Sequence, residues 1–245
     1  MREADRRIVI AAVGMAISFH IAMAASRRSR CWAAVMTNWK VGAKDVNLLV
    51  LCIVARRVRI PVLWSMLEGC GNSGTQERKA LIERYIGIFG LASIRMLLAD
   101  REFVGSKWFE FLVENNIPFA IHERGDLTAI LDDGRVIALA FAAKRRSDGT
   151  LIIVATNRRP LAALHDYKKR WQIECLFGDT KTRGLNMEDT GLTQPAKLGL
   201  LTAIVALALA WAHACASTVK GRVDIERASH RYRRKSWFRT GFDML

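Results

Sequence analysis

The sequence predicts an α/β domain on three observations. Val46–Val54 and Ile94–Ala99 are continuously apolar and rich in branched residues, as expected for strands buried on both faces of a sheet. Two other segments, which begin at Thr75 and Ser106, carry apolar residues at helical spacing. Short strand-like runs separated by turn residues follow Pro118. This order of strands, helices and a β-meander is that of an α/β fold.

The remaining elements follow in chain order. Val58–Met66 is predicted to be the hairpin partner of the first strand, because Arg56 and Arg57 separate the two apolar runs. Thr75 is expected to cap the next helix and Gly90 to end it. The second helix should extend from Ser106 to Asn116. The meander is predicted from four runs: Phe119–Ile121, Ala129–Leu131, Val136–Phe141 and Leu151–Ala155.

Composition excludes several classes of protein. The chain has 245 residues, of which 51% are hydrophobic, so it can bury one large core and is not disordered. Its five cysteines are scattered and form no C-x-x-C pair, which excludes a disulfide-stapled secreted module. Thirty-eight Lys and Arg against 23 Asp and Glu give a net charge of +15. That surplus points to a polyanionic partner, either nucleic acid or an acidic membrane surface.

Two apolar stretches keep a membrane role open. Residues 1–25 imitate a secretory signal, with three arginines before the run Ile8–Phe19. Leu198–Val219 carries no charged residue and is long enough to cross a bilayer. A helix buried inside a soluble protein has the same composition, so the stretch alone does not decide between the two.

The candidate functional residues lie at the end of a predicted strand and on a predicted helix. Asp100 directly follows the second buried strand, where ligands and metals tend to bind in an open α/β sheet; a solvated turn is the alternative. A long helix is predicted from Pro160 to Lys181. On it, Tyr167, Arg170, Glu174 and Lys181 are spaced so that one face carries all four.

That face combines one carboxylate with cations, as suits a phosphodiester site. A surface helix with ordinary ion pairs is the alternative interpretation. Trp171 and Leu176, together with Ile173, are expected to cover the side of the helix that faces the core.

The spacing Tyr167-x2-Arg170-x3-Glu174-x6-Lys181 resembles the "YREK" signature of bacterial insertion-sequence DDE transposases. Further blocks resemble the same family in the same order, so that the resemblance covers about residues 37 to 245. These blocks are Thr37–Lys40, Leu98–Phe103, Asp189–Thr193 and Ser236–Leu245.

The resemblance implies a ribonuclease-H-like mixed sheet flanked by helices, with a β-rich insertion between the second catalytic Asp and the Glu. It implies an enzyme that performs Mg²⁺-dependent DNA cleavage and strand transfer at element ends, with two Mg²⁺ ions held by three carboxylates. Asp100 and Glu174 would be catalytic metal ligands. Tyr167, Arg170 and Lys181 would bind the DNA phosphates.

One departure from the family pattern is decisive. Val35 occupies the position of the first catalytic Asp, and residues 1–36 do not resemble the family. We therefore expect three parts: an aberrant segment 1–36, a transposase core 37–219 with its insertion at about 119–160, and a basic segment 220–245. The chain would be a truncated or degenerate copy with impaired activity. The alternatives are a catalytically dead DNA-binding remnant and a protein anchored by the 198–219 helix.

The expected partner is double-stranded DNA, as the inverted-repeat ends of the element and as target DNA. A homodimer in a synaptic complex is left open, no membrane is expected, and the location implied is the bacterial cytoplasm, at the nucleoid. The basic segment between Lys220 and Arg239 is expected to contact the DNA backbone. His122 and His165 have no metal-ligating residue at a suitable spacing, so surface or core roles are expected for both.

Overall fold

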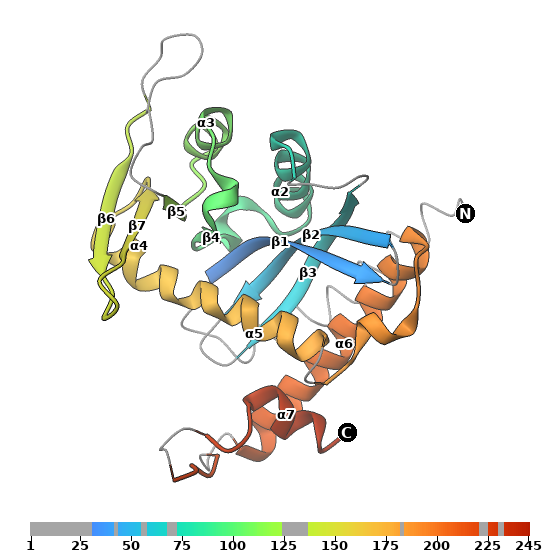
Figure 1. Cartoon of the computed structure of the whole chain (residues 1–245). Coiled ribbons are helices and arrows are strands. Elements are labelled where there is room, and N and C mark those ends of the chain that lie inside the picture. Colours follow the sequence, from blue (N-terminus) through green and yellow to red (C-terminus); the bar gives the residue numbers. More distant parts are fainter. Residues whose placement is uncertain are drawn as a thin grey trace.

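The computed structural model describes residues 31–41, 44–54, 58–67, 73–123, 137–181, 184–220, 225–229 and 233–245, with the side chains of those from Asn47 onward except residues 219 and 220 (Figure 1). The signal-like run Ile8–Phe19 and the predicted run Ala129–Leu131 lie outside these residues.

A seven-stranded mixed sheet forms the centre of the fold, in the order β3-β2-β1-β4-β5-β7-β6. Strand β2 is antiparallel to both β1 and β3, β4 and β5 run parallel to β1, and β7 is antiparallel to both β5 and β6. The bounds are β1 Cys31–Val41, β2 Lys44–Val54, β3 Arg59–Leu67, β4 Leu97–Ala99, β5 Phe119–Glu123, β6 Ala140–Arg145 and β7 Leu151–Thr156.

Helices cover both faces of this sheet (Figure 1). On one face lie α2 and α3, and on the other lie α4, α5 and α6, so the predicted α/β fold of a mixed sheet flanked by helices is confirmed. The bounds are α2 Thr75–Phe89, α3 Ser106–Glu114, α4 Pro160–Tyr167, α5 Trp171–Thr180, α6 Pro195–Lys220 and α7 Trp237–Phe242. The 3₁₀ turns among the described residues are η1 Leu91–Ser93, η2 Arg101–Phe103, η3 Lys168–Arg170 and η4 Met187–Thr190.

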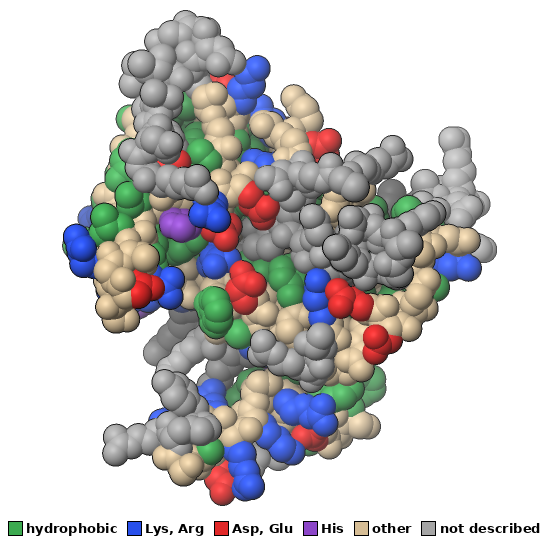
Figure 2. Space-filling view, in the orientation of Figure 1, with side chains coloured by type: hydrophobic (Ala, Val, Ile, Leu, Met, Phe, Trp, Pro, Cys, Tyr) green, Lys and Arg blue, Asp and Glu red, His purple; other side chains and the backbone are tan. Residues whose placement is uncertain are grey.

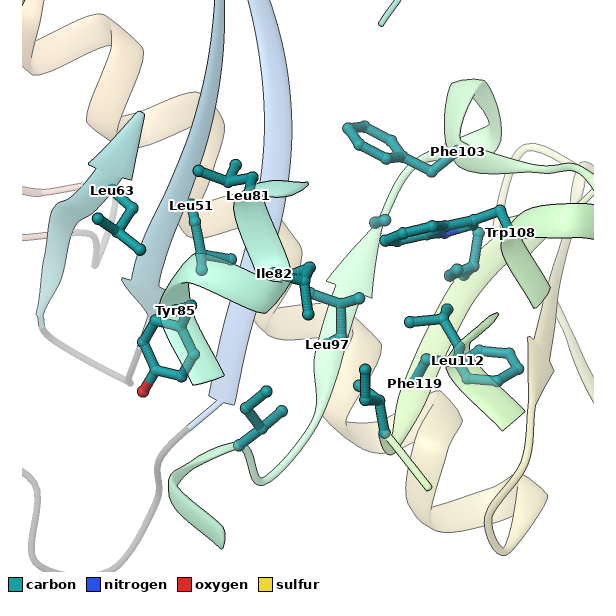
Figure 3. Close-up of a cluster of buried hydrophobic side chains, with 14 of the residues drawn as sticks. Leu51, Leu63, Leu81, Ile82, Tyr85, Leu97, Phe103, Trp108, Leu112 and Phe119 are labelled. Atoms are coloured by element: carbon teal, nitrogen blue, oxygen red, sulfur yellow. The ribbon is translucent and has the colours of Figure 1, made fainter. Parts of the chain in front are cut away.

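The continuous apolar run of β2 is explained by burial on both faces. Leu49 and Leu51 belong to the core beneath α2 and α3, whereas Leu48 and Val50 belong to the core beneath α5 and α6. Successive side chains of a strand point to opposite faces, so a strand covered on both sides needs apolar residues at every position. Figure 3 shows the first of these cores, where Tyr85 of α2 and Trp108 of α3 pack toward the sheet.

Two local expectations are wrong. Thr75 is the first residue of α2 rather than its cap, because Gly74 occupies the N-cap position with an extended backbone. The single helix expected from Pro160 to Lys181 is divided into α4 and α5 by the 3₁₀ turn η3. A 3₁₀ turn winds at 3.0 residues per turn instead of 3.6, so it rotates the faces of the two helices relative to each other.

The apolar stretch 198–219 belongs to α6. Among the helices described, α6 is long and apolar enough to cross a membrane by length and composition, and half of its most apolar window is buried. One side of it, with Leu198, Leu209 and His213, is packed inside the protein. Helix α7 packs against α6, where Gly241 lies directly against the backbone of Ala212.

Candidate active site at the ends of β4 and β5

Asp100 directly follows the central strand β4. All three residues of β4 are fully buried, so the chain leaves the core at Asp100, whose side chain is 35% exposed. Its Oδ1 accepts a hydrogen bond of 2.9 Å from the backbone N–H of Arg101, which starts the turn η2. This bond fixes the carboxylate at the end of the strand.

His122 lies beside Asp100 on the neighbouring strand. The parallel register pairs Ala99 of β4 with Ile121 of β5, so the next residue of each strand comes alongside the other. The imidazole Nδ1 of His122 is 3.2 Å from Asp100 Oδ1. The surface or core role expected for His122 is therefore incomplete, because the residue is part of the site. The signal in the sequence is that His122 directly follows the apolar run Phe119–Ile121, as Asp100 follows Ile94–Ala99, although β5 itself continues to Glu123.

The strand on the other side of β4 brings Val35 to the same level. Strand β1 is parallel to β4 and pairs Ala33 with Leu98. Continued by two residues along each chain, this register places Val35 beside Asp100. The position at which the family resemblance requires a carboxylate is thus adjacent to Asp100, and the residue there has no ligating atom.

Helix α5 and the turn before it add a cation and a second carboxylate. Arg170 Nη1 lies 3.4 Å from Asp100 Oδ2 and 3.0 Å from Glu174 Oε1. Tyr167 is buried, and its ring centre is 5.9 Å from the guanidinium carbon of Arg170. Four of the five site residues expected from the sequence, Asp100, Tyr167, Arg170 and Glu174, are therefore brought together.

The charge states at the site follow from these contacts. The hydrogen bond from His122 is the largest influence on Asp100 and lowers its pKa to about 2, helped by the Arg101 N–H and the charge of Arg170 and opposed by burial. Burial raises the pKa of the Tyr167 hydroxyl. Burial also disfavours the Arg170 cation, but Tyr167 and the two carboxylates outweigh it and raise the Arg170 pKa. At neutral pH the pair is a carboxylate and a guanidinium.

Lys181 lies at the C-terminal end of α5, farther along the helix. Its Nζ forms an ion pair of 3.0 Å with Glu188 Oε1 of the turn η4. Lys181 is thus held by a carboxylate outside the cluster around Asp100.

The prediction of which α5 side chains face the core is partly wrong. Ile173 and Leu176 are buried as expected, but Trp171 is 63% exposed. The expectation assumed one regular helix, whereas η3 ends immediately before Trp171 and changes its direction. A large aromatic side chain is thereby exposed one residue after Arg170.

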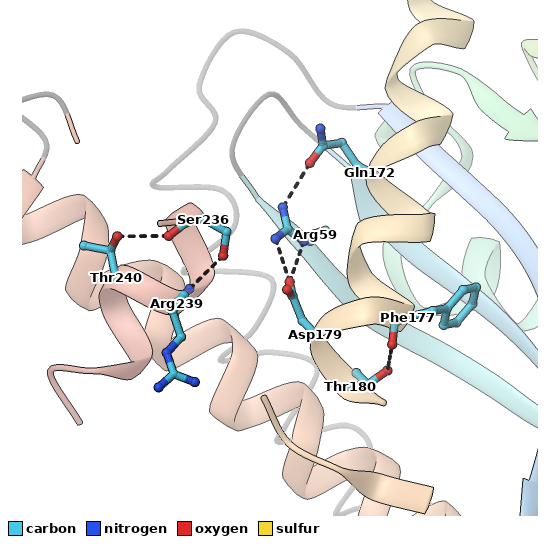
Figure 4. Close-up of polar contacts among 8 residues, drawn as sticks. All are labelled: Arg59, Gln172, Phe177, Asp179, Thr180, Ser236, Arg239 and Thr240. Atoms are coloured by element: carbon cyan, nitrogen blue, oxygen red, sulfur yellow. Dashed lines mark hydrogen bonds and ion pairs between the residues drawn. The ribbon is translucent and has the colours of Figure 1, made fainter. Parts of the chain in front are cut away.

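A buried ion pair holds α5 against the sheet (Figure 4). Arg59 of β3 approaches Asp179 with Nη2 at 2.6 Å from Oδ2, and it donates a further hydrogen bond to Gln172 Oε1 at 3.1 Å. Since Gln172 and Asp179 lie on either side of Glu174 in the sequence, this network fixes the helix segment that carries the carboxylate.

Cations of the C-terminal segment are also partly paired. Lys235 and Arg239 both form ion pairs of 2.7 Å with Asp243, and Arg234 lies 3.5 Å from Glu226. Figure 2 shows basic and acidic side chains interleaved over the visible face of the molecule. The prediction that this segment contacts DNA stays a prediction.

The donor set differs from that of a three-carboxylate metal centre. Asp100 and Glu174 supply two carboxylates, and Arg170 lies between them. In the part of the chain that the structure describes, no three metal-ligating side chains converge.

The mixed sheet flanked by helices fits a ribonuclease-H-like transposase. In it, Asp100 lies at the end of a parallel strand and Glu174 lies on a helix that packs nearby. The sequence matches the transposase DDE domain family over residues 64–211, more than half of the chain, and the chain belongs to that family. Members act on DNA in transposition and generally depend on divalent metal ions. None of the curated proteins compared with the sequence matches it.

Proposed function

We propose that this chain is an insertion-sequence transposase that binds the ends of its element but is impaired in cleaving them. The observation that supports the proposal is the parallel register of β1 and β4, which pairs Ala33 with Leu98 and, extended by two residues, sets Val35 at the level of Asp100. A valine at that position removes one of the three carboxylates that a two-metal mechanism requires.

The residues present do not fit a pair of Mg²⁺ ions. Mg²⁺ prefers oxygen ligands, and here the two remaining carboxylates share a single guanidinium, whose charge they already neutralise in part. We therefore assign no cleavage step to this site. Asp100 and Glu174 are proposed as the remnant of the family's metal centre.

DNA binding depends on groups that the structure retains. Arg170 and Lys181 are proposed to bind backbone phosphates, and Tyr167 is proposed to support Arg170 from beneath. Each of these cations has a carboxylate partner in the free protein, so a phosphate has to compete with Glu174 or Glu188. The exposed Trp171 provides an apolar surface beside them on which a base could stack.

The parts of the chain are proposed as follows. Strands β6 and β7, which extend the sheet beyond β5, correspond to the family's insertion at about 119–160. Strand β1 begins at Cys31, so the sheet includes residues ahead of the proposed boundary at 37. The basic segment 220–245 is proposed to add contacts to the DNA.

Two alternatives remain distinct from this proposal. A DNA-binding remnant with no catalysis has the same missing ligand and differs only in having no residual nicking. A membrane anchor through α6 is favoured by its apolar length but opposed by its packing against α7 and β3. Membrane fractionation of the expressed chain separates this last alternative from the other two.

The test restores the missing carboxylate. The chain and its Val35→Asp and Val35→Asn variants are incubated with Mg²⁺ and a duplex that carries the terminal sequence flanking the reading frame. Val35→Asp should nick this duplex, whereas the original chain and Val35→Asn, which has similar size but no charge, should bind it with little or no nicking. Robust nicking by the original chain would overturn the proposal.

A further inference from the structure

We propose that Arg78 is a positioning residue for Asp100, because it fastens the turn η2, on which the orientation of the Asp100 carboxylate depends. The inference deepens the proposed function and rests on it, since it takes Asp100 as part of the family's active site. It assigns a role in that site to a residue of α2, a helix on the opposite face of the sheet from Glu174.

Arg78 is a buried cation on the core-facing side of α2. The residue is only 6% exposed, and it shares this side of the helix with Leu81, Ile82 and Tyr85. An apolar side chain is the usual occupant of such a position. Arg78 is also the fourth residue of α2, where the positive end of the helix dipole disfavours a cation.

The guanidinium of Arg78 joins two segments that are distant in the sequence. Its Nε donates a hydrogen bond of 2.9 Å to Ser73 Oγ, and its Nη2 donates one of 2.6 Å to the backbone oxygen of Ser73. The same Nη2 donates to the backbone oxygen of Glu102, in η2, at 2.8 Å. Replacement of a buried charge by a well-packed apolar side chain is often neutral or stabilising, so stability alone does not call for an arginine here.

The turn η2 needs support from outside. It is a single 3₁₀ turn, a conformation whose hydrogen bonds have poorer geometry than those of an α-helix. The Phe103 N–H donates to the backbone oxygen of Asp100 at 2.9 Å, but the following bond, from Val104 N–H to Arg101, is 3.4 Å long. One external anchor is the Phe103 side chain, which is fully buried and lies beside Trp108 in the core (Figure 3).

Arg78 provides a second anchor at the same point of the turn. Its guanidinium carbon lies 4.7 Å from the centre of the Phe103 ring, within the range of a cation–π contact, while Nη2 holds the carbonyl of the preceding residue, Glu102. The turn is linked to the carboxylate by the Arg101 N–H, which donates to Asp100 Oδ1 at 2.9 Å. A displacement of η2 therefore displaces the hydrogen bond that orients Asp100.

The shape of the arginine side chain is essential to this contact. Nη2 reaches two carbonyl oxygens while Nε reaches a hydroxyl, so the planar guanidinium fixes all three bonds together. A lysine ammonium is a point charge on a flexible stem and lacks this rigid arrangement of donors. Arg78→Lys, which keeps the charge, and Arg78→Met, which removes it, should therefore both loosen the turn.

The first measurement is amide hydrogen exchange by NMR in the full-length chain, with native circular dichroism checked for each variant. In Arg78→Met and Arg78→Lys, exchange should become about tenfold faster or more at Phe103 and stay unchanged at Leu98 of β4. The matched control is Arg84→Met, because Arg84 belongs to the same helix but donates from Nη2 to the backbone oxygen of Trp64 in β3, at 2.6 Å. It should leave the exchange at Phe103 unchanged.

The second measurement places the same three substitutions in the Val35→Asp chain, with Mg²⁺ and the duplex that carries the terminal sequence. A misplacement of about 1 Å can lower a catalysed rate about 10²-fold. We therefore expect both Arg78 variants to nick at least about tenfold more slowly at saturating duplex. Their affinity for the duplex should be unchanged, because the Arg170 and Lys181 side chains are not altered.

Several results would overturn the inference. Unchanged exchange at Phe103 in the Arg78 variants would show that the turn does not depend on Arg78. Equal acceleration at Phe103 and Leu98 would show a general loss of stability instead. Undiminished nicking by the Arg78 variants of the Val35→Asp chain would show that the carboxylate is positioned without Arg78. Failure of Val35→Asp itself to nick would count against the proposed function, whereas the exchange measurement would still decide whether Arg78 holds the turn.

Discussion

Arg59 and Asp179 form a buried ion pair between β3 and α5, with Nε and Nη2 of the guanidinium 2.8 Å and 2.6 Å from one carboxylate oxygen. Their side chains are only 7% and 5% exposed. Because α5 carries Glu174, this pair sets the position of the carboxylate relative to Asp100 on the sheet. The site thus depends on a contact that contains none of its own residues.

Removal of one partner should destabilise the fold strongly. Asp179→Asn leaves the Arg59 cation buried without its counter-charge, and breaking a buried pair in this way costs about 3–5 kcal/mol of unfolding free energy. The double variant Arg59→Met, Asp179→Leu should lose less, because it removes both charges. Urea unfolding measures the difference, and equal losses in the single and double variants would contradict it.

The Asp100 carboxyl should titrate unusually low. Its folded pKa of about 2 lies below the value of about 3.9 for an unfolded aspartate. The group therefore contributes stability that is present above pH 4 and is lost as the pH falls toward 2. In His122→Ala the largest cause of the shift is gone, so the pKa should rise.

Carbon-13 NMR of the Asp100 carboxyl measures this pKa directly. His165→Ala is the control, because its ring does not contact Asp100, and it should leave the titration unchanged. A midpoint that is the same in His122→Ala as in the original chain would show that the hydrogen bond is not the main cause.

Replacement of the tryptophans on α5 and α3 by alanine should affect different properties, DNA binding in the first case and stability in the second. Trp171 is 63% exposed, so Trp171→Ala should leave stability nearly unchanged and weaken binding to duplex ends. Trp108 is 1% exposed in the core beneath α3, and Trp108→Ala should cost about 3–5 kcal/mol. Thermal unfolding and salt-dependent DNA binding separate the two effects. A Trp171→Ala chain that binds DNA normally would exclude a role in recognition.

Gly241 should be indispensable for the contact between α7 and α6. A Cβ at this position would overlap the carbonyl oxygen of Ala212 and lie 2.6 Å from its carbonyl carbon. Because backbone atoms cannot give way, Gly241→Ala should lower stability by about 1–3 kcal/mol. Gly87→Ala in α2 is the matched control, since a Cβ there meets nothing within 4 Å. It should stabilise the helix by up to about 1 kcal/mol, and chemical denaturation of both variants tests the contrast.

The sheet could be predicted wherever burial on both faces left an uninterrupted apolar run, as in Val46–Val54. The long segment from Pro160 was predicted less well, because nothing in its apolar spacing marks the 3₁₀ turn that exposes Trp171. A residue count along one helix gives its faces only while the winding stays regular.

The site shows a second limit of sequence reasoning. The sequence points to Asp100 because it follows the apolar run Ile94–Ala99, and His122 follows the apolar run Phe119–Ile121 in the same way. The sequence nevertheless predicts only a surface or core role for His122, because no metal-ligating residue stands at a suitable spacing from it. The relation between the two residues exists only across β4 and β5, and strand order is a tertiary property that local spacing does not contain.

Among the described strands, β6 lies at one edge of the sheet, and an edge strand offers its backbone N–H and C=O groups to any strand that approaches. Its last residues, Lys144 and Arg145, are exposed cations, so a second copy that approaches edge to edge meets like charge. High salt, which releases basic proteins from DNA, screens that repulsion as well. Removal of DNA by high salt during purification should therefore favour aggregation. Light scattering across a salt series would detect it.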